Sequence, residues 1–368
     1  MPAVSASATE PKPITSEDEA VTFVERILEM KGHLNASVYW AAQGNVAEAK
    51  THAKHPKNEY WNLVGPEIEA ANATFAQRLE SKLNALPEKA ATMEPGEYRA
   101  HIRQDIYPLL DEAVNRTVAA DARSGLAFEG EVAMKLLDRI GVEYANAMND
   151  QGEIVNLMEY WDARGFANVL ETRYDAEIAP ELSSANAEEL AKFIDTVQRN
   201  IASKVSPSEL KPVLEETAHE IKEYTGAGET ASHSGSSGPN ATIQRITENL
   251  DRVVALYEQD KPTKAKQLLT ETYLTQFEGL EGPLIEQRPK LVETLEAAFN
   301  EKLPTQIDNG APVSEVEATV ENMKEDLTLA KKVLASGGET TVEIDDETTT
   351  TQSGTVETTA GSTATQTQ

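Results

Sequence analysis

Cysteine is absent from the 368-residue chain. Its absence excludes disulfide bonds, cysteine-ligated zinc, iron–sulfur clusters and covalently attached c-type haem. Long apolar runs are missing too, since no stretch approaches the roughly 18–20 residues that cross a bilayer. The chain also contains neither a Gly-x-Ser-x-Gly nucleophile turn nor a phosphate-binding glycine loop. The sequence therefore gives no support for nucleophilic catalysis, and we expect a protein that is not an enzyme.

Basic side chains are scarce. The chain has 33 lysine and arginine residues against 62 acidic ones, a formal net charge of −29. Nucleic acids and anionic lipid surfaces are both bound by basic patches, so neither is an expected partner. The acidity fits either a surface that stays soluble, for example in a salty medium, or a surface that concentrates cations.

Apolar residues recur at helical spacing along most of the chain, and no segment alternates as a strand does. We therefore expect an all-α protein built of helical bundles. Its first helix is predicted to begin at Ser16, which has capping-box spacing to Glu19, and to be interrupted or ended at Gly32. A second capping box, Ser206 with Glu209, predicts the start of a helix that runs to about Tyr224 and ends the first helical region.

Composition divides the chain into five parts. They are predicted as a disordered leader at 1–15, a helical domain with two hairpin repeats at 16–225, a flexible linker at 226–239, a four-helix bundle at 240–336 and a disordered Ser/Thr-rich stalk at 337–368. Stalks of this kind are often glycosylated and lift a domain from a cell surface, although a plain disordered tail fits as well. With four Asn-x-Ser/Thr sequons, this favours an extracellular or surface-tethered protein.

One motif recurs along the chain, in full at 66–73 and 180–187 and in part at 282–286. Gly44 and Gly165 each follow a Tyr-Trp pair by the same spacing, which predicts the same helix–turn junction twice. We interpret these matches as copies of one helical hairpin. Recurrent helix-end chemistry is the alternative.

Three histidines flank the first predicted turn. His33 precedes Gly44 by the same number of positions by which His55 follows it, so an antiparallel hairpin would bring the two level. His52 is one helical turn from His55, and Glu59 follows His55 at i+4. Three or four nitrogen and oxygen ligands on a helical frame suit iron, copper or zinc.

The third copy of the motif provides a comparison for these histidines. Aligned on the first copy, it places Leu250, Leu269 and Thr272 opposite the three histidines, which suggests that His33 and His52 point into a core. A buried imidazole needs partners for both ring nitrogens. Three interpretations remain: satisfied core histidines, ligands of a metal ion or b-type haem, and a pH-responsive element.

Other candidate residues carry weaker patterns. Trp40 lies near His33 in sequence and could line a haem or aromatic-ligand pocket, although a packing anchor fits equally. Carboxylates that could support the histidines from a neighbouring helix, or simply face solvent, are Glu143, Glu159 and Asp162. His101 and Asp105 have helical i,i+4 spacing and are expected to form a surface cluster.

Two stretches resemble known families. Residues 257–281, with Tyr273-x-x-x-Phe277-Glu278-x-x-Glu281, resemble the extracytoplasmic helical domain that precedes the membrane part of iron-permease family proteins. The first region, with Ala47 to Pro56 and Glu159-Tyr-x-Asp162, is similar to exported archaeal cell-surface proteins. The permease's membrane Arg-Glu-x-x-Glu motifs are absent, so transport itself is not implied. The resemblance implies an extracytoplasmic role linked to metal or haem.

The sequence thus predicts an extracytoplasmic protein that binds a metal ion or b-type haem, in a binding or electron-carrier role. Its expected ligands are His33, His52 and His55, with Glu59 as a further metal ligand and Trp40 beside a cofactor. The alternative is a structural cell-envelope protein without a ligand, which self-assembles or meets an envelope partner. A membrane tether beyond the stalk would fit either function.

Overall fold

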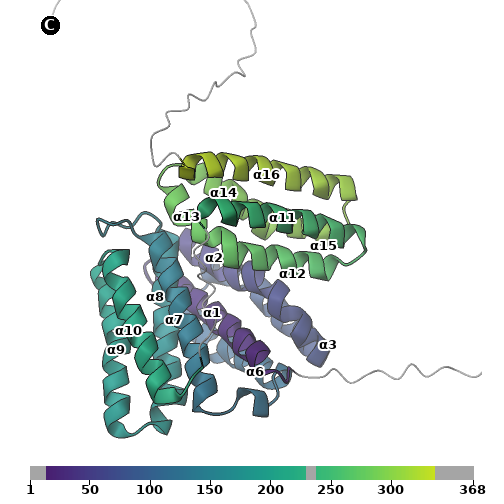
Figure 1. Ribbon diagram of the computed structural model, residues 1–368. Coiled ribbons are helices and arrows are strands. Elements are labelled where there is room, and N and C mark those ends of the chain that lie inside the picture. Colours follow the sequence, from purple (N-terminus) through teal and green to yellow (C-terminus); the bar gives the residue numbers. More distant parts are fainter. Residues whose placement is uncertain (1–13, 229–237, 336–368) are drawn as a thin grey trace, which may run out of the picture.

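The computed structural model describes residues 14–228 and 238–335, which fold into helices joined by short turns (Figure 1). Within these residues no strand forms, and the two isolated β-bridges join Ile14 to Val118 and Met148 to Ile154. The all-α prediction is confirmed for this part of the chain. None of its helices is both long and apolar enough to cross a membrane. The predicted stalk, and most of the predicted leader and linker, lie outside the described residues.

The first group of helices contains the predicted hairpin. Helices α1 (Glu17–Ala42) and α2 (Val46–His55) are joined through Gly44, whose φ of +74° is a conformation that glycine adopts readily. The Asn45 side chain caps α2 by accepting the backbone N–H of Glu48. The other helices of this group are α3 (Trp61–Asn84), α4 (Leu86–Thr92), α5 (Pro95–His101) and α6 (Tyr107–Thr117).

A second group forms a four-helix bundle, in which each helix packs against the next in the chain and the last against the first. Its members are α7 (Leu126–Ala147), α8 (Leu157–Arg173), α9 (Ser184–Ser203) and α10 (Pro207–Thr225). The capping box at Ser206 and Glu209 forms as predicted, with both reciprocal hydrogen bonds. At Ser16 the predicted box does not form, because that side chain makes no capping hydrogen bond.

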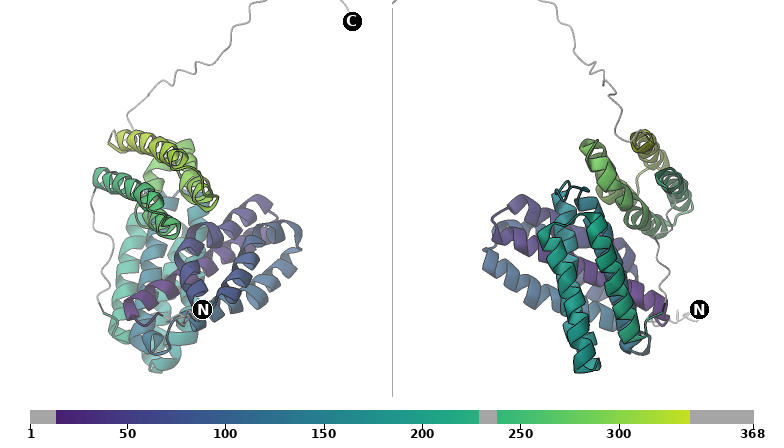
Figure 2. Two further views of the ribbon diagram at one scale, coloured as in Figure 1. Left: turned by 90° about the vertical axis from the view of Figure 1, so that its right-hand side faces the viewer. Right: turned by 60° about the vertical axis from the view of Figure 1, so that its left-hand side comes forward.

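The third group builds a layer of its own at one end of the molecule (Figures 1 and 2). Its members are α11 (Pro239–Glu258), α12 (Pro262–Thr272), α13 (Glu278–Ile285), α14 (Pro289–Ala297), α15 (Leu303–Asp308) and α16 (Val313–Ala335). Short π-helical turns directly follow several of the α-helices. They are η1 (Pro56–Tyr60), η2 (Ile102–Ile106), η4 (Tyr174–Ile178), η6 (Tyr273–Phe277) and η7 (Ala298–Lys302). Two 3-10 turns are η3 (Asp121–Arg123) and η5 (Ala179–Glu181).

Two glycines set the crossing of α1 and α8. A Cβ on Gly165 would lie 2.3 Å from the carbonyl oxygen of Gly32, and a Cβ on Gly32 would lie 2.1 Å from the Phe166 ring. The helices therefore approach as closely as their backbones allow. This corrects two expectations, since α1 runs through Gly32 to Ala42 and Gly165 lies inside α8. Because α8 continues through Gly165, the turn of the hairpin predicted as the second repeat does not form there.

The third group packs closely on α7. The Asn146 side chain donates to the carbonyl oxygen of Glu278 at 2.7 Å, and a Cβ on Gly282 would lie 2.7 Å from the Asn146 Cα. Arg139 donates to the carbonyl oxygen of Leu274 at 3.0 Å. Buried apolar side chains continue through all three groups as one core. The site described next therefore lies among helices that are held against one another.

Candidate metal centre

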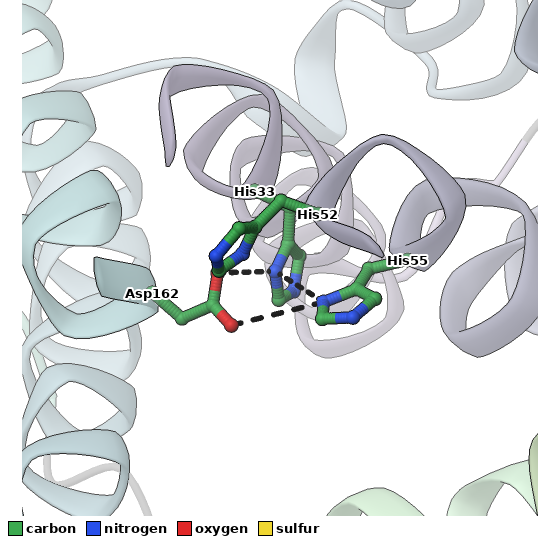
Figure 3. A group of neighbouring side chains, drawn as sticks. All are labelled: His33, His52, His55 and Asp162. Carbon is green, nitrogen blue, oxygen red and sulfur yellow. Dashed lines mark hydrogen bonds and ion pairs between the residues drawn. The ribbon is translucent and has the colours of Figure 1, made fainter. Parts of the chain in front are cut away.

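The hairpin brings the three predicted histidines together. His33 extends from α1, and His52 and His55 extend from consecutive turns of α2 (Figure 3). The Nδ1 atoms of His33 and His55 are 3.0 Å apart. All three side chains are buried, and His52 is completely shielded from solvent. Leu250, Leu269 and Thr272, which the third copy of the motif places opposite them, are buried as well.

Asp162 completes the group from the other side. It lies on α8, one turn before the crossing glycine, and points between the imidazoles (Figure 3). Its Oδ1 atom is 2.7 Å from His33 Nδ1 and 3.0 Å from His52 Nδ1, and its Oδ2 atom is 3.7 Å from His55 Nδ1. From the sequence, Asp162 was expected only as a supporting carboxylate. In the structure it contacts all three histidines directly.

The spacing of these four donors fits one metal ion. A ligand atom from each of the four side chains lies within 4.8 Å of the other three. In a tetrahedral site with metal–nitrogen distances of about 2.0–2.1 Å, neighbouring donor atoms are about 3.3 Å apart. The closest donor pairs here are separated by 2.7 to 3.0 Å. A small outward movement of the side chains would therefore give coordination distances.

The ring nitrogens are unequally satisfied. His33 Nε2 lies 3.2 Å from the Tyr60 hydroxyl, a contact that can orient this ring so that Nδ1 faces Asp162 and His55. His52 Nε2, in contrast, is buried without a hydrogen-bond partner. The interpretation as satisfied core histidines thus fits His33 and fails at His52. A buried nitrogen without a partner costs free energy, so the hydrogen-bonded group is incomplete as a purely structural element.

Burial and mutual interactions set the charge of two members of the group. Burial would by itself raise the pKa of Asp162, but the neighbouring His33 and His52 hold that pKa well below its usual range. Asp162 is thereby kept as an anion. Burial, with repulsion from His33, lowers the pKa of His55 well below its ordinary value. A neutral imidazole and a charged carboxylate are the forms that bind metals.

Glu59 lies at the edge of this group. Its Oε2 atom is 3.7 Å from both His33 Nε2 and His55 Nδ1. Burial raises the pKa of Glu59 well above its usual range, and repulsion from Glu278 and Asp162 adds to this. The position permits Glu59 to support the site, although it is outside the group of four whose donor atoms converge.

A cavity of about 200 Å³ adjoins the histidines and opens to the surface. His33, His55, Glu59 and Asp162 form its inner wall, and exposed side chains such as Glu301 stand at its rim. An ion could therefore reach the buried donors without unfolding of the hairpin. This access distinguishes the group from a sealed structural site.

The remaining candidates lie elsewhere. Trp40 packs edge-on against Tyr39 and Trp161, with ring centroids 5.3 and 5.4 Å away, and is not among the residues that line the cavity. His101 Nδ1 lies 2.7 Å from Asp105 Oδ2. His101 is not one of the four residues whose donor atoms converge. The structure thus gives Trp40 a packing contact rather than a contact with the site.

A model of a protein family matches part of the chain. Residues 119–228 match the model of the iron permease-associated 4-helix bundle domain, which here corresponds to α7–α10. No curated protein and no solved structure matches the chain. The likeness to iron-permease proteins therefore lies on residues 119–228, whereas the motifs in the sequence placed it on residues 257–281. The matched domain supplies Asp162, and the three histidines come from the helices that precede it.

Proposed function

We propose that this protein binds one transition-metal ion, with iron as the expected ion, through His33, His52, His55 and Asp162. The convergence of four buried donors from α1, α2 and α8 is the observation that carries the proposal. Three nitrogen donors and one oxygen donor suit iron, zinc, copper or nickel. Iron is favoured because the helix that provides Asp162 belongs to an iron permease-associated domain.

A bare ion fits this donor set better than haem does. A porphyrin supplies the equatorial nitrogens itself, so a haem iron takes at most two axial side chains from the protein. Here four side chains converge, and the adjoining cavity is about 200 Å³. The ion would be bound as cargo or as a resident centre, and no reaction is assigned to it.

The proposed role is capture of metal outside the cytoplasm, for uptake by a separate permease. Three features support it: the access to the site from solvent, the excess of acidic over basic residues and the iron permease-associated domain. A negatively charged surface raises the local concentration of cations and so speeds their arrival. The cell surface as location remains part of the proposal.

Metal analysis of the native, untagged protein tests the binding. We expect one equivalent of iron after anaerobic loading with Fe²⁺ and desalting, and a substoichiometric amount for a His33→Ala/His52→Ala variant. His101→Ala is the matched control, because that histidine is also buried but contacts Asp105 and is outside the group of four. Equal metal content in the double variant and in the wild type would overturn the proposal.

A further inference from the structure

A second set of donors lies on the same cavity. Glu159 of α8, Glu281 of α13 and Glu296 of α14 each place a carboxylate oxygen within 4.8 Å of the other two. Glu159 and Glu281 are buried, and Glu296 is half-buried. Glu159 precedes Asp162 by one helical turn, so the two sets of donors lie along one face of α8.

Glu281 provides independent evidence that something is missing between these side chains. It is 0% exposed, and by distance and angle neither of its carboxylate oxygens has a hydrogen-bond partner. The one side chain close enough to share a proton with it is another carboxylate, Glu296. An unpaired carboxylate at this depth is strongly unfavourable, because burial removes its hydration and nothing replaces it. Burial accordingly raises the pKa of Glu281 well above its usual range, with repulsion from Glu296 and Glu278 adding to it.

Further buried carboxylates near Glu281 add to the excess of acidic over basic side chains. Buried carboxylates from three groups of helices gather here, namely Glu29, Glu59, Glu143, Glu159, Asp162, Glu278 and Glu281. Arg139 is paired with three of them, Glu29, Glu143 and Glu278. Among the described residues, no lysine or arginine donates a hydrogen bond to Glu281. The region therefore needs either protons or a cation.

We propose that Glu159, Glu281 and Glu296 bind a second cation, of the hard class that prefers oxygen ligands, such as Mn²⁺, Ca²⁺ or Fe³⁺. An all-carboxylate set selects such ions, whereas the histidine group suits borderline transition metals. The ion would give Glu281 the partner that it lacks. It would also join α8, in the domain matched to the iron-permease family, to α13 and α14 of the C-terminal layer.

This inference does not rest on the proposed function, since the two sets share no ligand. Members of both sets line one cavity, with Glu159 and Glu296 on its wall beside His33 and Asp162. An ion at the carboxylates would therefore sit on the same route as an ion at the histidines. A cation bound by the carboxylates would then lie next to the histidine site.

Mn²⁺ binding, followed by the electron paramagnetic resonance signal of free Mn²⁺, tests the second site in the full-length protein. We expect Glu281→Gln and Glu296→Gln to weaken one Mn²⁺ equivalent at least about tenfold, because each removes a charged ligand. Glu286→Gln is the matched control, since that residue is an exposed glutamate next to α13. It should bind as the wild type does.

The His33→Ala/His52→Ala variant separates the two proposals. It should retain the Mn²⁺ equivalent that Glu281→Gln loses. The second site is wrong if Glu281→Gln and Glu296→Gln bind Mn²⁺ as the wild type does, or if the only bound Mn²⁺ disappears with the histidines. Neither result would bear on iron binding by the histidine group, which is measured separately.

Discussion

Asp162 is the residue on which the first site depends most, because it contacts all three histidines. We expect Asp162→Asn to weaken binding of the transition metal at least about tenfold. Even side chains that only support a metal ligand contribute about 10–100-fold to affinity, so loss of an anionic ligand should cost no less. Calorimetric titration with Zn²⁺ or anaerobic Fe²⁺ measures the change.

Asp105→Asn is the control for this substitution, because that aspartate also contacts a histidine but is 63% exposed. It should leave the affinity unchanged. If Asp162→Asn and Asp105→Asn bind metal equally well, Asp162 has no part in the site.

Glu29 makes the stability of the metal-free protein depend on pH. Burial first, then repulsion from Glu25, raises the pKa of Glu29 to about 8 in the folded state. The folded protein therefore holds a proton that the unfolded chain, with a pKa of about 4.3, has released. Stability from this group is present at low pH and is lost as the pH rises towards 8. One such group contributes a slope of at most about 1.4 kcal/mol per pH unit.

Urea unfolding of the chelated protein at pH 6.5 and pH 8 checks this prediction. The free energy of unfolding should fall with pH in the wild type, and should fall less in Glu29→Gln, whose side chain cannot ionise. The fall should persist in Glu17→Gln, because Glu17 is exposed at the start of α1. A decline of the same size in Glu29→Gln would show that another group is responsible.

At the scale of the elements, the crossing of α1 and α8 places His33 against Asp162. We expect Gly165→Ala to destabilise the fold by about 1–3 kcal/mol, because the new Cβ would lie 2.3 Å from the Gly32 carbonyl oxygen. The same substitution should weaken metal binding, since it pushes the two helices apart. Thermal unfolding and metal titration of one preparation measure both effects.

Gly279→Ala is the matched control for the crossing. Gly279 lies in α13, and a Cβ added there would meet no atom within 4 Å, so alanine should be neutral or slightly stabilising. Equal stability and metal affinity of Gly165→Ala and Gly279→Ala would show that α1 and α8 do not need glycine at position 165.

Local sequence rules located the hairpin and missed the crossing. Helix geometry and residue counting predict the turn at Gly44 and place His33 opposite His55 in the hairpin. The sequence places helix ends at Gly32 and Gly165, because a glycine inside a helix and one after it have the same local signal. Only the packing of α1 on α8 distinguishes them. Asp162 was undervalued for the same reason, since no local pattern says which helices touch.

The recurring motif differs between its copies in the structure. The π-helical turns η1 (Pro56–Tyr60) and η6 (Tyr273–Phe277) are separated by the same offset that relates the first and third copies of the motif. Such turns often occur at functional sites; η1 contains Glu59 and η6 is followed directly by Glu278, and both glutamates line the cavity. The structural equivalence of the first and third copies stays a prediction. The second copy does not form the predicted turn, because Gly165 lies inside α8.

At the scale of the whole molecule, Arg139 holds three groups of helices together. Its guanidinium pairs with Glu143 of its own helix, Glu29 of α1 and Glu278 of α13. We expect Arg139→Met to lower the free energy of unfolding by about 3–5 kcal/mol, because it leaves buried carboxylates without a cation. Denaturant unfolding at neutral pH measures the loss.

Arg199→Met serves as the comparison, because Arg199 and its partner Asp195 are both exposed. It should change stability by no more than about 0.5 kcal/mol. Equal stability of the two variants would mean that Arg139 does not join the helical groups.

The central claim, that His33, His52, His55 and Asp162 hold one metal ion, is tested most directly by X-ray absorption spectroscopy of the iron-loaded protein. We predict one iron per chain with light-atom ligands at about 2.0–2.2 Å and the outer-shell scattering of imidazole rings. His33→Ala/His52→Ala should hold a substoichiometric amount of iron, and the imidazole scattering of that iron should be weaker, because only His55 of the three histidines remains. Iron without imidazole scattering, or no retained iron, would contradict the claim.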